Sequence, residues 1–259
     1  MKILIVNPNS TDAMTRDIGR TAERVASAGT EIVAVTAAGS TPSIESFVED
    51  VVASAETVST VLNMPGGFDA VVSACAYDPA VYALREALDV PVIGILEAAS
   101  LVSRLLAPSF SVVTVLPRGV VHVEDVLTRT GLDRKCKSVI GVELGVLDLE
   151  RRREESLQAL QSACDEAVHG DGAEAVVLGC AGMSYYKSRL SSMLDVPLID
   201  GVECAVGLAE LCLRSGLSTS KHQTFAPLVP KEIAATEEGP GPNPLLSLLY
   251  GASSSSSNV

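Results

Sequence analysis

Gly67-Phe-Asp-Ala-Val-Val-Ser-Ala-Cys75-Ala-Tyr-Asp-Pro79 is the stretch that decides the fold, because the chain contains it twice. The second copy is Gly172-Ala-Glu-Ala-Val-Val-Leu-Gly-Cys180-Ala-Gly-Met-Ser184, and a Leu-Asp-Val-Pro segment follows each copy, at 88–91 and 194–197. The two cysteines are 105 residues apart and the two Asp-Val-Pro turns 106, so one residue has slipped between these features. Two copies of one supersecondary unit, each with a cysteine at the same point, predict two half-sites that face each other.

The rest of the chain alternates between short apolar runs and segments with helical spacing. The expected strands are 2–6, 30–35, 70–74, 90–95, 110–116, 139–142, 175–178 and 196–199, and the expected helices are 12–28, 43–62, 79–88, 120–130, 150–168, 185–193 and 203–214. Strands that alternate with helices indicate parallel sheets built from right-handed crossovers. We therefore predict an α/β protein with two pseudosymmetric lobes, each a mostly parallel sheet flanked by helices.

The expected domain boundaries follow from the repeat. Residues 1–98 form the first lobe, joined by the C-terminal segment 207–233, and residues 99–206 form the second lobe. Residues 234–259 are rich in Gly, Pro and Ser and are expected to be a disordered tail, since burial cannot offset their ordering entropy.

Ligands of open parallel sheets bind beyond the carboxyl ends of the strands. Both cysteine loops lie at such ends, and so does the Asn7-Pro-Asn-Ser-Thr11 segment that contains Asn9 and Ser10. A pseudo-twofold arrangement brings these loops together, so we expect the active site in the cleft between the lobes.

Composition narrows the range of partners. A formal net charge of −13 over 259 residues argues against nucleic acid and anionic membranes, both of which require a basic surface. No apolar run approaches the ~18 residues of a membrane span, and the N-terminus lacks a signal-peptide cleavage site. We expect a cytoplasmic homo-oligomer that acts on a small molecule.

The six cysteines include no C-x-x-C pair, and His122, His169 and His222 are scattered, so we expect neither a disulfide framework nor a metal site. His122 and His169 are expected on helix surfaces. No G-x-G-x-x-G follows a strand, so nucleotide binding has no support.

Cys75 and Cys180 each sit between a strand and a helix, where free N–H groups and the helix dipole favour a thiolate. A thiolate on one side of a carbon acid and a thiol on the other can invert it, because one removes a proton and the other delivers one to the opposite face. Hydrogen-bond donors must stabilise the resulting oxyanion. We expect them in the loop of Asn9 and Ser10 and in the backbone after each cysteine, at Ala76, Tyr77, Ala181 and Gly182.

Simpler interpretations exist. A cysteine after an apolar strand is more often a small buried hydrophobic residue than a catalyst, and only the duplication favours chemistry. Cys136, Cys164, Cys204 and Cys212 lack the loop position and are expected to be structural. Glu97 and Glu203 fit either helix starts or the cleft, and the Tyr77 ring fits packing better than catalysis.

These motifs resemble the aspartate/glutamate racemase superfamily, and most closely its hydantoin racemase branch, which includes allantoin racemases and related fungal proteins. The resemblance rests on Asn7-Pro-Asn-Ser-Thr11, Ala74-Cys75 with Asp78-Pro79, Asp89-Val-Pro-Val-Ile-Gly94 and Leu178-Gly-Cys180, and it runs from residue 1 to about 230. It implies two α/β lobes, no cofactor, acid and base roles for the two cysteines, and a substrate contact at Thr114.

The chain departs from glutamate racemases at two points. It has Ala181-Gly182 where they have Thr-His, and Asn7-Pro8 where they have Asp-Ser. Without these auxiliary acid–base groups, a neutral ring with an acidic proton fits better than a free amino acid. The resemblance therefore implies a racemase of 5-substituted hydantoins, with allantoin of purine catabolism as the natural case. Amino-acid racemisation, maleate-type isomerisation, malonate decarboxylation and non-catalytic metabolite binding remain as alternatives.

Overall fold

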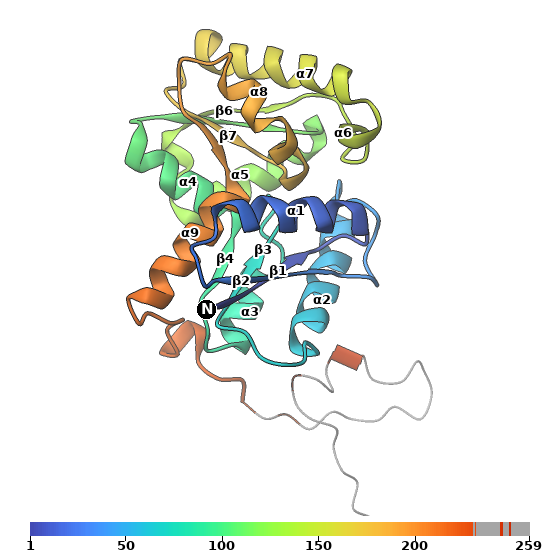
Figure 1. Ribbon diagram of the computed structural model, residues 1–259, viewed down its shortest axis with the longest axis vertical. Coiled ribbons are helices and arrows are strands. Elements are labelled where there is room, and N and C mark those ends of the chain that lie inside the picture. Colours follow the sequence, from blue (N-terminus) through green and yellow to red (C-terminus); the bar gives the residue numbers. More distant parts are fainter. Residues whose placement is uncertain (230, 232–243, 246–248, 250–259) are drawn as a thin grey trace, which may run out of the picture.

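The computed structural model contains two four-stranded parallel sheets, one in each half of the chain (Figure 1). It describes residues 1–229, 231, 244, 245 and 249. The strand orders are β2-β1-β3-β4 and β6-β5-β7-β8, so the two sheets have the same topology. The strands are β1 (Lys2–Asn7), β2 (Glu31–Thr36), β3 (Ala70–Ser73), β4 (Val92–Gly94), β5 (Phe110–Thr114), β6 (Cys136–Gly141), β7 (Val176–Leu178) and β8 (Leu198–Asp200). The predicted fold class is confirmed.

Helices cover the sheets and connect successive strands. The α-helices are α1 (Asp12–Val25), α2 (Phe47–Leu62), α3 (Val81–Ala87), α4 (Ile95–Leu106), α5 (Val120–Thr130), α6 (Asp148–Arg151), α7 (Arg153–Asp165), α8 (Lys187–Ser191) and α9 (Gly201–Arg214). Among the described residues, no helix is both long and apolar enough to cross a membrane.

The central strands are buried on both faces, which explains their unbroken apolar sequence. In the first half, Ile3, Ile5 and Val72 are completely buried, and the same holds for Val113 and Val177 in the second half. β1 and β3 lie in the middle of the first sheet, and β5 and β7 in the middle of the second. The cysteine loops thus emerge from a central, fully buried strand of each half.

The last helix of each half packs against the opposite half. Val202 and Ala205 of α9 belong to a core cluster with Ile5 and Val72 of the first sheet. Leu96 of α4 belongs to a cluster with strands of the second sheet. Figure 1 shows α9 beside the strands β3 and β4, and α4 beside the second sheet. This exchange fixes the two halves against each other, and with them the loops that both halves contribute to the site.

Three expected helices differ most from the structure, and α4 lies where no helix was expected. The helix expected at 43–62 begins only at Phe47, because the Ser46 side chain accepts from the Glu49 N–H and caps it. The helix expected at 150–168 is interrupted at Arg152, which separates α6 from α7. The α-helix ends at Asp165 and is followed by a π-helical turn, Glu166–Gly170. The segment expected as helix 185–193 is a 3₁₀-helix, Ala181–Tyr186, followed by the short α8.

Most of the tail expected at 234–259 lies outside the described residues. Of its described positions, Leu245 packs against the core cluster that contains Leu4 and Val71 of the first sheet.

Candidate active site

A small cavity of about 30 Å³ lies where the carboxyl ends of the central strands of both sheets meet. It is lined by Asn9, Met14, Ile44, Ala74, Cys75, Ala76, Tyr77, Thr114, Val115, Val146, Gly179, Cys180 and Ala181. Cys75 from the first half and Cys180 from the second both contribute to its wall. None of these lining residues carries a charge, so the cavity is suited to an uncharged group.

Seven of the nine residues expected at the site line this cavity: Asn9, Cys75, Ala76, Tyr77, Thr114, Cys180 and Ala181. Ser10 does not; its backbone N–H donates to Thr41 O at 2.9 Å. Gly182 lines a larger neighbouring cavity instead. Six further residues complete the wall: Met14, Ile44, Ala74, Val115, Val146 and Gly179. Ala74, Val115 and Gly179 directly adjoin expected site residues in the sequence, whereas nothing in the local sequence of Met14, Ile44 and Val146 distinguishes them from ordinary core residues.

Cys75 follows β3 in a tight turn. Asp78 and Ala80 adopt left-handed backbone conformations, with φ of 47° and 61°, and α3 begins only at Val81. Burial raises the pKa of the Cys75 thiol well above its usual range. The backbone N–H of Tyr77 lowers this pKa, whereas Cys180 and nearby carboxylates raise it further. The backbone N–H after Cys75 thus acts in the expected direction, but burial outweighs it.

Cys180 follows β7 and leads directly into the 3₁₀-helix Ala181–Tyr186. The backbone N–H groups of Gly182 and Met183 lie near its sulfur and lower its pKa, although the Met183 N–H donates a hydrogen bond to the Cys180 carbonyl oxygen at 3.0 Å. Burial is still the larger effect and raises the pKa of the Cys180 thiol to about 11. The helix start thus acts in the expected direction at Cys180, but burial outweighs it.

Asn9 is held in place by its neighbours. Its Oδ1 accepts from Asn7 Nδ2 at 2.8 Å and from the Thr11 N–H at 2.9 Å. Its own Nδ2 donates to Met14 Sδ at 3.2 Å. The hydroxyl of Thr114 donates to Gly179 O at 3.2 Å, which ties β5 to the Cys180 loop. Asn9 therefore presents a side-chain donor at the cavity, and the Thr114 hydrogen bond stabilises the part of the cavity wall formed by β5 and Gly179.

A stack of three rings supports the Cys75 loop. The His122 ring lies between Phe47 and Tyr77, with centroid distances of 3.8 and 4.2 Å. His122 is buried, so its expected position on a helix surface is wrong. The sequence did contain a sign of this burial: His122 lies four residues, about one helical turn, before Val126, which is on the buried face of α5. Packing of the Tyr77 ring fixes the backbone N–H that faces the Cys75 sulfur.

A loop contact closes the cavity between the halves. Glu45 of the first half accepts a hydrogen bond from the Val146 N–H of the second half, at 2.8 Å from Oε1. Ile44 and Val146 beside this contact both line the cavity.

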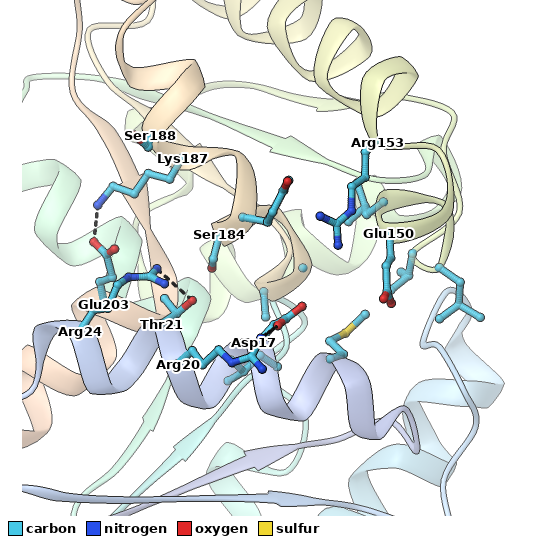
Figure 2. Close-up of a pocket in the computed structure, with 18 of the residues that line it drawn as sticks. Asp17, Arg20, Thr21, Arg24, Glu150, Arg153, Ser184, Lys187, Ser188 and Glu203 are labelled. Atoms are coloured by element: carbon cyan, nitrogen blue, oxygen red, sulfur yellow. Dashed lines mark hydrogen bonds and ion pairs between the residues drawn. The ribbon is translucent and has the colours of Figure 1, made fainter.

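Glu97 and Glu203 occupy the first turns of α4 and α9 and line no part of the small cavity. Glu97 pairs with Arg85 at 2.7 Å, and Glu203 pairs with Lys187. Glu203 lines the larger cavity, where Figure 2 shows its ion pair with Lys187.

Within the described part of the chain, no three His, Cys, Asp or Glu side chains are grouped so that they could hold a metal ion.

Comparison with known proteins identifies close relatives along most of the chain. The Asp/Glu/hydantoin racemase family matches residues 3–209. A hydantoin racemase of Pseudomonas sp. (strain NS671) is 38% identical over 244 residues, which cover 94% of this chain and 98% of that protein.

Two solved structures are similar over nearly their whole length. The allantoin racemase of Pseudomonas fluorescens has a TM-score of 0.89 at 38% identity, covering 91% of this chain and 100% of that one. The allantoin racemase from Klebsiella pneumoniae has a TM-score of 0.87 at 36% identity, covering 91% and 96%.

Proposed function

This chain belongs to the Asp/Glu/hydantoin racemase family and is an isomerase of the racemase type, and we propose that its substrates are 5-substituted hydantoins, with allantoin as the natural case. The observation that carries the proposal is the uncharged cavity with a cysteine from each half in its wall. A zwitterionic amino acid needs charged partners for its ammonium and carboxylate groups, because burying an unpaired charge is unfavourable. A neutral hydantoin ring needs none. The similarity to proteins named hydantoin racemase and allantoin racemase supports the same substrate class.

In the proposed mechanism, the two sulfurs exchange roles with the direction of reaction. One cysteine thiolate takes the proton from C5 of the ring, so that the C–H bond breaks and its electron pair delocalises into the adjacent carbonyl. The thiol of the other cysteine then donates its proton to the opposite face of C5. The products are the mirror-image ring and a site in which the thiol and the thiolate have changed places.

The enolate oxygen requires hydrogen-bond donors. We assign this task to the N–H groups of Ala76 and Ala181 and to the side-chain amide of Asn9, all from residues that line the cavity. The N–H groups of Tyr77, Gly182 and Met183 lie near the sulfurs instead. The backbone after each cysteine thus serves both the reacting sulfur and the developing oxyanion.

The test is a substrate panel followed by polarimetry. We expect the protein to abolish the optical rotation of one enantiomer of allantoin, and of other 5-substituted hydantoins, faster than the rate without protein. In deuterium oxide, the C5 proton should exchange during turnover. Racemisation of free aspartate or glutamate with hydantoins left untouched refutes the proposal. Release of carbon dioxide from a malonate, or binding without exchange, points to a decarboxylase or a binding protein.

A further inference from the structure

A second, larger cavity of about 640 Å³ lies beside the small one. Helix α1 forms one wall, and the starts of α6, α7 and the 3₁₀-helix after Cys180 form the other (Figure 2). Met14, Val146 and Ala181 line both cavities, so these three residues separate them.

The sizes of the two cavities conflict with a substrate held in the small one alone. A volume of about 30 Å³ is close to the share of one water molecule in the liquid. A hydantoin ring with its two carbonyl groups is several times larger. A volume of about 640 Å³ is in the ordinary range of small-molecule sites. Ring binding therefore requires the partition between the cavities to move.

Met14 is the part of the partition that can move. It is half-buried on α1 and packs against core clusters of both halves. An unbranched thioether side chain changes rotamer readily, unlike the β-branched Val146. Gly182 lies close to Met14 and has no side chain: a Cβ added there would lie 3.1 Å from Leu149 Cδ1, 3.7 Å from Met14 Cε and 3.7 Å from Cys180 Sγ. A side chain at position 182 would therefore contact Met14 next to the Cys180 sulfur, at the boundary between the cavities.

Movement of Met14 also releases a donor. Its sulfur accepts the hydrogen bond from Asn9 Nδ2 at 3.2 Å. When the Met14 side chain turns away, this amide becomes available to a carbonyl oxygen of the ring.

We propose that Met14 is a specificity-determining residue: it turns aside as the ring binds between the cysteines, and the 5-substituent extends past it into the larger cavity. The inference rests on the proposed function and names the class of substituent. The wall next to Met14 is formed by Ile18, Val146 and Leu149, and polar residues such as Thr21 and Ser184 also line the cavity. The cavity therefore has room for an apolar alkyl or aryl group as well as for the ureido group of allantoin. Charged residues, among them Arg20, Arg153 and Lys187, also line this cavity (Figure 2).

The test compares 5-methylhydantoin with 5-benzylhydantoin by kcat/KM. Met14→Ala widens the passage, so we expect the ratio of benzyl to methyl activity to rise about tenfold, a discrimination that apolar pockets ordinarily reach. Gly182→Ala narrows the passage from the other side and should lower the ratio by a similar factor, mainly through KM.

Two further variants serve as controls. Met14→Leu conserves side-chain volume and should keep the ratio within about twofold of the wild-type value. Met193 is exposed and lines neither cavity, so Met193→Ala should leave both activities unchanged.

The inference is overturned if Met14→Ala and Gly182→Ala alter both substrates by the same factor, or shift the ratio in the same direction. If Met14→Ala fails to fold, Gly182→Ala and Met14→Leu still test the inference. Gly182→Ala should lower the ratio of benzyl to methyl activity, whereas Met14→Leu should leave it nearly unchanged. If the wild-type protein racemises neither of these hydantoins nor allantoin, the proposed function itself has failed; if it racemises allantoin alone, this inference is overturned and the proposed function stands.

Discussion

The two cysteine loops have the same origin in the fold but different surroundings. Each cysteine lies two residues beyond a central strand, β3 or β7. Cys75 then enters a turn with two left-handed residues, whereas Cys180 enters a 3₁₀-helix at once. One backbone N–H lowers the pKa of the first sulfur, and two lower that of the second. A duplicated sequence motif therefore gives two equivalent positions for sulfur, but not two equivalent sulfurs.

The same asymmetry appears in the buried carboxylate of each half. In the first half, Asp78 of the cysteine loop accepts from the N–H groups of Leu96 and Glu97, at 3.0 and 2.8 Å, and so caps α4. Burial raises the pKa of Asp78 to about 7. Gly94 at the end of β4 leaves room for this carboxylate, since a Cβ there would overlap it.

In the second half, the carboxylate comes from the end of the strand instead. Asp200 accepts from the Glu203 N–H at 3.0 Å and caps α9, and Ser184 of the cysteine loop donates its hydroxyl to Asp200. Ser184 lies 106 residues after Asp78, and Asp200 lies 106 residues after Gly94. Asp78 and Gly94 therefore correspond to Ser184 and Asp200. The capping carboxylate is at the first position of this pair in the first half and at the second position in the second half. This arrangement puts a carboxylate in the Cys75 loop itself, where it raises the pKa of Cys75.

Removing either sulfur should have the largest effect. We expect Cys75→Ser and Cys180→Ser each to lower racemisation by about 10³-fold, in the range of general acid–base catalysis. Each variant keeps one base, so it should still exchange the C5 proton of one enantiomer with deuterium, and the two variants should exchange opposite enantiomers. Proton NMR in deuterium oxide measures this. Cys212→Ser, on α9 and outside the small cavity, is the matched control. Exchange of the same enantiomer by both variants contradicts opposed sulfurs.

The second largest effect should be the dependence of kcat/KM on pH, which follows from the raised pKa values of the two thiols. The active free protein needs one thiolate, and the more acidic sulfur is Cys180, with its pKa raised to about 11. Below that pKa, the thiolate fraction grows about tenfold per pH unit. We expect kcat/KM to rise about a hundredfold between pH 7 and pH 9, in both directions of racemisation. A flat profile over this range shows that the thiolate already exists at neutral pH.

Moving the capping carboxylate from position 78 to position 94 tests the comparison of the two halves by its effect on the free energy of unfolding. Gly94→Asp places a second buried carboxylate against Asp78, so we expect the free energy of unfolding to fall by about 3 kcal/mol or more. The double variant Asp78→Ser, Gly94→Asp copies the arrangement of the second half and should recover most of this loss.

Urea denaturation measures both values, and Ser184→Asp with Asp200→Gly is the reciprocal experiment in the second half. A double variant no more stable than Gly94→Asp alone disproves the equivalence of the two caps.

The ion pairs beside the caps should show the smallest effect. Glu97–Arg85 and Glu203–Lys187 occupy corresponding helix starts, and their side chains are 18–29% exposed. We expect Glu97→Gln and Glu203→Gln each to lower the free energy of unfolding by at most about 1 kcal/mol, and less at high salt. Double-mutant cycles with Arg85 and Lys187 isolate the pair energies. A loss of several kcal/mol at only one helix would reveal a difference between the halves that their similar burial does not explain.

The parts of the fold that the sequence predicted are those governed by local pattern. The eight strands follow from short apolar runs, and the parallel sheets follow from their alternation with helices. The predicted ends of α2 and α7 were wrong, because the Ser46 cap and the break at Arg152 depend on backbone geometry that apolar spacing does not encode. His122 was placed on the surface because one histidine weakens an apolar stripe, although the rings of Phe47 and Tyr77 bury it in the fold.

By itself, the sequence determined the duplication, the family and the position of a cysteine beyond a central strand in each half, because these features are written in contiguous residues. Only the tertiary structure decided that Met14 separates two cavities, that Asp78 and Asp200 cap corresponding helices from different positions, and that the two sulfurs differ in acidity. The reason is physical: burial, cavity size and pKa depend on which side chains meet in space, and the residues that meet here come from opposite halves of the chain.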